Sequence, residues 1–115
     1  LEENQIPING LFFITGDRHW QYHSIDRATG YNEFSAGPFV DANARLGRNP
    51  GDPKSTDPDA DLVIQPYTSR TPSGGFLFVR IEPGGSPWNT SRATFEMRDE
   101  NGVILYSTFV DAGKN

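Results

Sequence analysis

Two side chains that could bind a metal ion, Asp17 and His19, stand two positions apart in the stretch GLFFITGDRHW, residues 10–20. They follow an apolar run at residues 11–15 whose composition favours a strand buried on both faces over a short helix. An extended chain brings every second side chain to the same side, so the carboxylate and the imidazole can converge on one metal ion, or on one ion and a second-layer partner. The spacing alone favours a turn-forming Asp beside a packed His, and the metal site is its alternative.

A second histidine, His23, lies four residues beyond His19. On a straight strand it shares a face with His19 and Gln21, so it could be a further ligand or a residue at the rim of a substrate site. The interpretation that we prefer is an ordinary histidine that is hydrogen-bonded within its strand.

The composition limits the classes of function. The 115 residues suffice for one domain, and the hydrophobic fraction of 35% predicts a thin core. Asp and Glu outnumber Lys and Arg by 15 to 10, and the net charge of -5 argues against a nucleic-acid polymer or an anionic membrane as partner. The chain has no Cys, so a metal ion would need His, Asp, Asn or backbone oxygen ligands. No apolar run reaches the roughly 18 residues of a membrane span.

The pattern of apolar and turn residues predicts a mainly β fold, an antiparallel meander that carries one long loop. Gly30 can take the positive φ that closes a hairpin, and prolines interrupt the middle of the chain, where only residues 61–65 are strand-like. We expect a single domain or fragment, residues 1–115, made of a strand and GDRH segment at 10–20, a hairpin at 20–36, a long Pro/Gly/Asp-rich loop at 37–73 and strands at 75–110.

The last hairpin carries the clearest local signal. Asn101-Gly102 suits a type I′ turn, and an even-length loop gives the flanking strands a common apolar face. The residues that we expect on that face are Ala93, Phe95, Met97, Ile104, Tyr106, Thr108 and Val110.

The string GLFFITGDRHWQYHSID, followed by TGYNEFSAGP, resembles the C-terminal part of PhoD-like alkaline phosphatases, members of the calcineurin-like metallophosphatase superfamily. In that family a buried strand ends in a Gly-Asp-x-His motif whose His binds one ion of a two-metal centre. The resemblance implies that His19 is a metal ligand and that Asp17 is its partner, either as a second ligand or as a residue that orients the first. Arg18 and Trp20 lie within the matched string and could belong to a rim or substrate site. The match is strongest over residues 10–38 and looser beyond, and it implies the C-terminal part of an α/β/β/α sandwich.

The family's further ligand motifs lie on earlier strands and are of the kinds Asp-x-His, Gly-Asp-x-x-Asp and Gly-Asn-His; none accompanies the GDRH segment in this chain. A two-metal centre needs a full set of bridging and terminal ligands. The resemblance therefore implies a metal-dependent phosphoester hydrolase, periplasmic or extracellular, to which this segment supplies one ligand motif. The complete enzyme would use divalent or ferric metal ions, and we expect the isolated chain to be inactive.

A competing hypothesis is a noncatalytic β module that binds carbohydrate or a protein partner through the long loop, with Asp17 and His19 in structural roles. It rests on the loop aromatics Tyr67 and Trp88 and on the incomplete set of catalytic motifs. If the chain is instead part of a larger two-sheet fold, its open strand edges and apolar faces are expected to make it self-associate.

Overall fold

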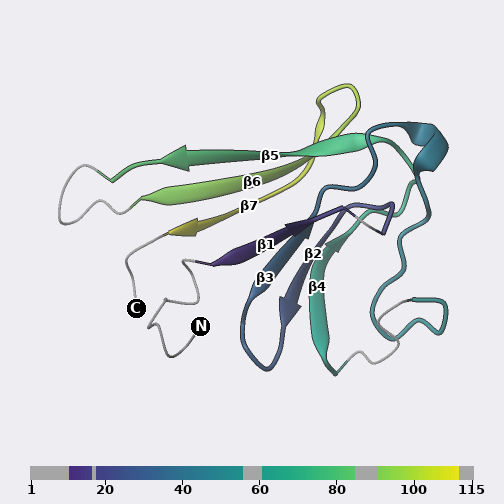
Figure 1. Cartoon of the computed structure of the whole chain (residues 1–115), viewed down its shortest axis with the longest axis horizontal. Coiled ribbons are helices and arrows are strands. Elements are labelled where there is room, and N and C mark those ends of the chain that lie inside the picture. The colour runs from purple at the N-terminus through teal and green to yellow at the C-terminus, as the bar shows by residue number, and fades with distance from the viewer. Residues whose placement is uncertain (1–10, 17, 56–60, 85–90, 112–115) are drawn as a thin grey trace.

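The computed structural model describes residues 11–16, 18–55, 61–84 and 91–111, which form two β-sheets (Figure 1). The mainly β prediction is confirmed. The strands are β1 Phe12–Thr15, β2 Tyr22–Asp26, β3 Asn32–Ser35, β4 Val63–Thr68, β5 Gly75–Glu82, β6 Arg92–Asp99 and β7 Ile104–Asp111, and a 3₁₀ turn, η3, covers Asp41–Asn43.

The first sheet has the strand order β1-β3-β2-β4. Strands β2 and β3 form an antiparallel hairpin, and Gly30 in its turn has a φ of +77°. β1 pairs with β3 in parallel, whereas β2 pairs with both of its neighbours in antiparallel fashion. The sheet is thus mostly antiparallel as predicted, but its strand order is not that of a meander. The expected burial of the first strand on both faces is also wrong: β1 is an edge strand, and Phe13 and Ile14 are 45% and 58% exposed.

Strand β4 lies inside the segment that the sequence predicts to be one long loop. It begins within the strand-like residues 61–65 and extends to Thr68, so the predicted loop is too long. Pro66 in this strand has no N–H to donate to a neighbouring strand. Because β4 is an edge strand, it can accommodate this proline. The β2–β4 register also shifts between His23 and Ile25, which pair with Tyr67 and Ile64. An edge position beside a register shift tolerates proline. The same shift leaves Ser24, between His23 and Ile25 in β2, without a pairing partner in β4.

The second sheet, β5-β6-β7, is antiparallel throughout. The expected common face of the last hairpin is confirmed by three cross-strand pairs: Ala93 with Val110, Phe95 with Thr108, and Met97 with Tyr106.

The turn of this hairpin differs from the expected type I′. A type I′ turn needs a positive φ at both central residues. Gly102 has a φ of +83°, but Asn101 is not among the residues with positive φ. The Gly102 N–H donates to the Asp99 carbonyl at 3.0 Å, and the Asp99 N–H donates to the Val103 carbonyl at 3.0 Å, so that the loop between Asp99 and Val103 has three residues. A register shift between Met97 and Arg98 restores the predicted faces, but it places Ile104 opposite Arg98, and Ile104 is 48% exposed.

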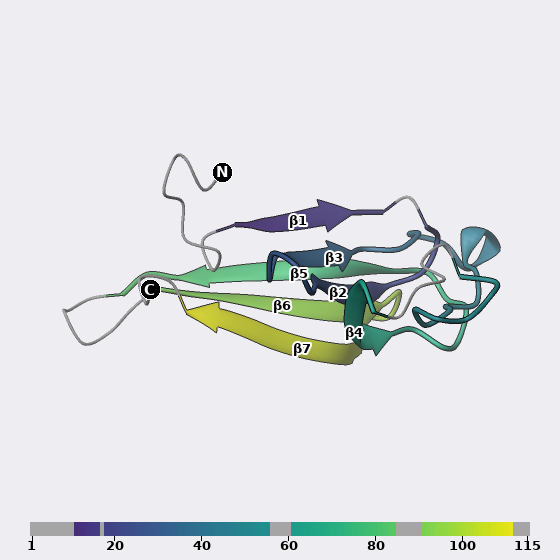
Figure 2. The ribbon, with the colours of Figure 1, turned by 90° about the horizontal axis from the view of Figure 1, so that it is seen from below.

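The core lies between the two sheets (Figure 2). Phe34 of β3 stacks on Phe95 of β6 with ring centroids 4.0 Å apart, and Phe12 of β1 meets the Phe95 ring edge-on at 4.8 Å. Ala93 and Met97 complete the buried cluster. Few side chains are fully buried, in keeping with the thin core that the composition predicts.

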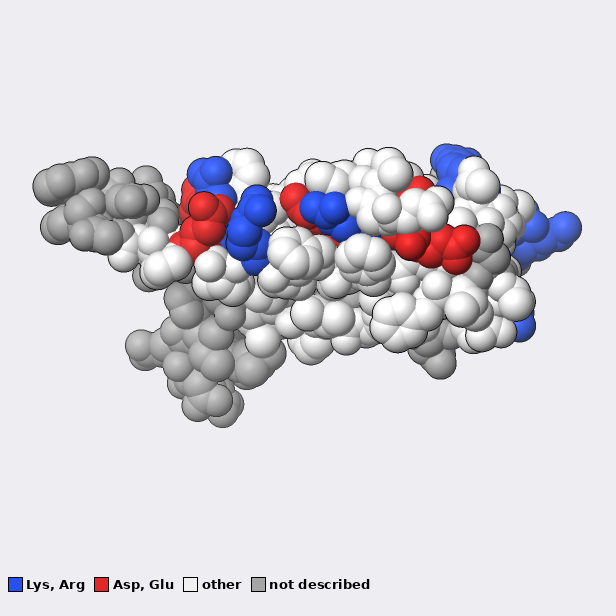
Figure 3. Space-filling view, turned by 90° about the horizontal axis from the view of Figure 1, so that it is seen from above, with Lys and Arg blue, Asp and Glu red and all other residues white. Residues whose placement is uncertain are grey.

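The outer surfaces combine apolar and charged side chains. Exposed apolar residues include Ile81 and Phe109, at 61% and 53%. The face in Figure 3 carries positive and negative side chains in alternation. Each sheet has two edge strands, β1 and β4 in the first and β5 and β7 in the second, with no further neighbour in the described structure. Such edges can pair with another chain, and self-association stays a prediction. Within the same described residues, no helix has the length and apolar character needed to cross a membrane.

Candidate functional site

The GDRH segment leaves the carboxyl end of β1 beside the carboxyl end of β3. The Ala36 N–H donates to the Thr15 carbonyl at 2.8 Å and so extends the contact between these two strands. Asp17 lies outside the described residues. His19 has a φ of +67°, in the left-handed region that non-glycine residues seldom occupy. Such backbone conformations cost roughly 1–3 kcal/mol and cluster at functional sites.

The imidazole of His19 is held by the last residue of η3, and its backbone by the loop that follows. Its Nδ1 lies 2.8 Å from the carbonyl oxygen of Asn43, and the Arg45 N–H donates to the His19 carbonyl at 2.9 Å. A carbonyl oxygen can accept a hydrogen bond but cannot donate one, so the contact requires the proton on Nδ1. In the neutral ring Nε2 then carries the lone pair, which is the state in which histidine binds a metal ion, and a backbone carbonyl on the other nitrogen is a common means of orienting such ligands.

Trp20 fixes the position of this segment through its buried side chain and its backbone carbonyl. Its side chain is buried, and the Ser35 hydroxyl donates to its carbonyl at 2.9 Å. Gly47 packs closely against it, because a Cβ at that position would lie 3.1 Å from Trp20 Cδ1 and 2.1 Å from the Ser69 carbonyl oxygen. Trp20 therefore positions the backbone of its neighbour His19.

His23 lies between the two sheets. Its Nδ1 is 2.8 Å from the Tyr106 hydroxyl, its Nε2 is 2.7 Å from Asn32 Oδ1, and its ring stacks on Phe34 with centroids 4.3 Å apart. The side chain is 5% exposed, so the preferred interpretation of a hydrogen-bonded strand histidine is confirmed. Both ring nitrogens are occupied, which leaves none for a metal ion.

The burial of His23 predicts a pH dependence of stability. Burial lowers the pKa of His23 from its ordinary 6.5. The unfolded chain therefore takes up a proton at a pH where the folded chain does not, and the free energy of unfolding should fall as the pH drops below about 6.5.

Urea unfolding at pH 7.5 and pH 5.5 measures this effect, with His23→Gln as the comparison. The variant cannot titrate at this position, so its free energy of unfolding should change less between the two pH values than that of the wild type. Equal changes in the two proteins would contradict the assignment.

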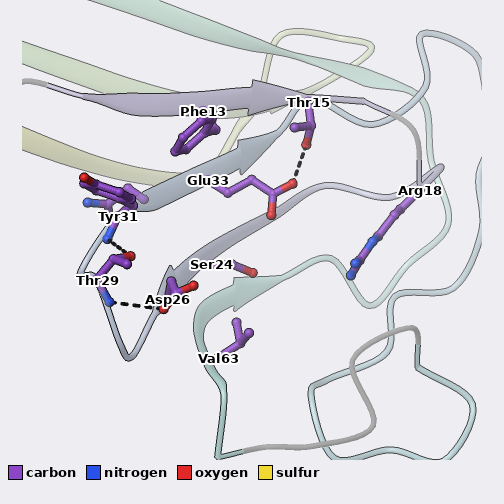
Figure 4. A pocket seen from close by; sticks show the side chains of 10 residues that line it. Phe13, Thr15, Arg18, Ser24, Asp26, Thr29, Tyr31, Glu33 and Val63 are labelled. Atoms are coloured by element: carbon purple, nitrogen blue, oxygen red, sulfur yellow. Dashed lines mark hydrogen bonds between the residues drawn. The ribbon is translucent and has the colours of Figure 1, made fainter. Parts of the chain in front are cut away.

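A pocket of about 460 Å³ opens on the outer face of the first sheet (Figure 4). Arg18, one of the residues proposed for a rim, lines it, and its guanidinium carbon lies 5.5 Å from the centre of the Tyr22 ring. Glu33 is central: its Oε2 accepts hydrogen bonds from the Thr15 hydroxyl and the Tyr22 hydroxyl, each at 2.8 Å. Burial, together with the hydrogen bond and charge of Glu33, raises the pKa of Tyr22 to about 12, so this phenol stays protonated and continues to donate.

The described residues contain no group of three or more His, Asp or Glu side chains that could hold a metal ion. His19 thus offers one imidazole to a site whose other ligands would come from Asp17 or from further polypeptide. The imidazole of His19 has the orientation and the nitrogen that a metal ligand needs, whereas both nitrogens of His23 are engaged elsewhere.

Comparisons with protein-family models, curated proteins and solved structures find no match to this chain. A functional interpretation therefore depends on the residues of the GDRH segment and their geometry.

Sequence reasoning missed two parts of this region. The Asn43 carbonyl that orients His19 belongs to a segment without any motif, and a backbone acceptor has no sequence signature. The pocket around Glu33 requires the register of three strands, which places Phe13 and Ser24 on either side of it.

Proposed function

We propose that this chain is the C-terminal segment of a PhoD-like metal-dependent phosphoester hydrolase and that His19 is one of its metal ligands. The observation that carries the proposal is the 2.8 Å contact from His19 Nδ1 to the Asn43 carbonyl, which leaves Nε2 without a partner among the described residues and able to bind a metal ion. The positive φ of the same residue and the position of the motif at a strand end support it. Two packed sheets are also what the metallophosphatase sandwich requires.

The roles of this chain's residues follow from their contacts. The Asn43 carbonyl fixes the tautomer and the ring orientation of His19, and the Arg45 N–H fixes its backbone. Buried Trp20 supports the segment from the sheet side. Divalent or ferric ions, once bound by a complete ligand set, would supply Lewis-acid stabilisation of charge on a phosphoester.

The polypeptide encoded ahead of Leu1 provides the test. We expect it to contain the carboxylate and histidine motifs of the family, and we expect the longer protein to hydrolyse a chromogenic phosphoester in the presence of divalent metal ions. Replacement of His19 by Gln should lower its kcat by about 100-fold or more, since even the residues that orient metal ligands contribute about 10–100-fold.

His23→Gln is the matched control, because it changes the other histidine of the chain. It should leave the hydrolysis rate near that of the wild type at a temperature where both proteins are folded. An upstream sequence without the motifs, or a His19→Gln protein with full activity, would refute the proposal.

A further inference from the structure

The pocket on the outer face of the first sheet contains a row of three side chains from three strands. Phe13 of β1 is paired with Glu33 of β3, and Glu33 is paired with Ser24 of β2. Side chains that face each other across neighbouring strands lie about 4.5–5.5 Å apart at Cβ. The Glu33 carboxylate therefore stands between an aromatic ring and a hydroxyl group, and all three line the pocket.

Ser24 is the most unusual member of this row. Its side chain is 5% exposed, and its hydroxyl has no hydrogen-bond partner within the described structure. Burying a hydroxyl without a partner costs roughly 1–3 kcal/mol, so such a group calls for an explanation. Figure 4 shows the Ser24 oxygen and the Glu33 carboxylate directed into the same space. A ligand in that space would complete the hydrogen bonding of Ser24.

The pocket lining contains two carboxylates, Glu33 and Asp26, against one cation, the guanidinium of Arg18. Glu33 uses Oε2 for both of its hydrogen bonds, which leaves Oε1 for a further donor. Asp26 uses Oδ1 to accept the N–H groups of Ala28 and Thr29 at 2.8 and 3.2 Å, and its Oδ2 makes no hydrogen bond with the described residues. A ligand with several N–H donors and a positive charge would match both carboxylates.

Apolar surface lies beside these acceptors. The rings of Phe13 and Tyr31 meet edge to face, with centroids 6.0 Å apart and planes inclined by 62°, and Val63 lines the pocket as well. Rings at this angle do not form the flat platform on which a sugar stacks, but they can contact a short alkyl chain and the cation attached to it.

We propose that this pocket binds a small primary alkylammonium ion. The ammonium group donates to Glu33, Ser24 and Asp26, and the alkyl chain lies against Phe13 and Tyr31. An anion would meet two carboxylates against the single guanidinium of Arg18, and a metal ion would find no group of three ligands among the described residues. His19 contributes nothing to this site, so the inference stands independently of the proposed function.

Titration of the 115-residue chain with n-butylammonium chloride, followed by NMR at constant ionic strength, tests the proposal. The uncharged 1-butanol is the matched ligand. We expect saturable shifts at the amides of Phe13, Ser24 and Glu33 with the amine, and binding of the alcohol weaker by about tenfold or more, as a charge-assisted hydrogen bond implies.

Three variants complete the experiment. Glu33→Gln should weaken amine binding by about tenfold or more, and Ser24→Ala by about threefold or more, in line with one charged and one neutral hydrogen bond. Glu82→Gln is the control, because Glu82 is an exposed carboxylate of β5 that does not line the pocket, and it should bind the amine as the wild type does. Ser24→Ala removes an unpaired hydroxyl, so it should fold even if Glu33→Gln does not.

Equal binding of the amine and the alcohol would overturn the proposal. So would equal affinities of Ser24→Ala and Glu82→Gln for the amine, or the absence of saturable amine binding.

Discussion

Replacing Phe95 by Ala is expected to lower the free energy of unfolding by about 3–5 kcal/mol. Phe95 is 1% exposed and joins the two sheets, since its ring stacks on Phe34 at 4.0 Å and meets Phe12 at 4.8 Å. Among the described residues, the buried cluster around Phe95 consists of Phe34, Ala93 and Met97, and the hydrophobic side chains packed against it are only partly buried. Few buried side chains could therefore move in to fill the cavity. Domains of this size have total stabilities of about 5–15 kcal/mol, so the loss would bring the chain near its unfolding threshold.

Phe39→Ala is the matched control for this prediction. Phe39 is 82% exposed, so the same change there should alter the free energy of unfolding by no more than about 0.5 kcal/mol. Urea denaturation followed by circular dichroism measures both variants. Similar destabilisation by the two substitutions would show that the sheets do not pack through Phe95 as described.

The sequence predicts the faces of the last hairpin well because apolar and polar residues alternate along β6. Phe95 and Met97 are two residues apart in β6 and both point into the core. The register shift at the turn could not be read from Asn101-Gly102, because the same pair of residues fits a type I′ turn and a three-residue loop with Gly at its end. The correct faces thus arose from a different turn.

The errors in the first sheet have a common physical cause. Whether Pro66 can lie in a strand depends on whether that strand is at an edge, and whether Phe13 and Ile14 are buried depends on what covers β1. Strand order and coverage are tertiary properties. A local pattern of residue types contains neither.

The candidate site was predictable in part. The GDRH string identified His19 as the residue to examine, and its geometry is that of an oriented imidazole. The partner that orients it, Asn43, lies 24 residues away in the chain and acts through its backbone. Glu33 and Ser24 came together only once the register of β2 and β3 was known.

Paramagnetic metal ions added to the chain are expected to act on one histidine and to spare the other. Nε2 of His19 has no partner in the described part of the chain, whereas both nitrogens of His23 are engaged by Tyr106 and Asn32 and the ring is buried. These are the two histidines of the chain, so their ring resonances can be assigned by replacing each one with Gln. Metal binding requires a neutral imidazole, so the experiment belongs at a pH above 7.

The central claim, that His19 is presented as a metal ligand, is tested most directly by titrating Co²⁺ or Mn²⁺ into the chain while recording these two ring resonances. The prediction is that the His19 signal broadens at metal concentrations that leave His23 unchanged, and that His19→Gln removes the response. If His19 is unaffected at millimolar metal, or if both rings broaden alike, the claim is wrong.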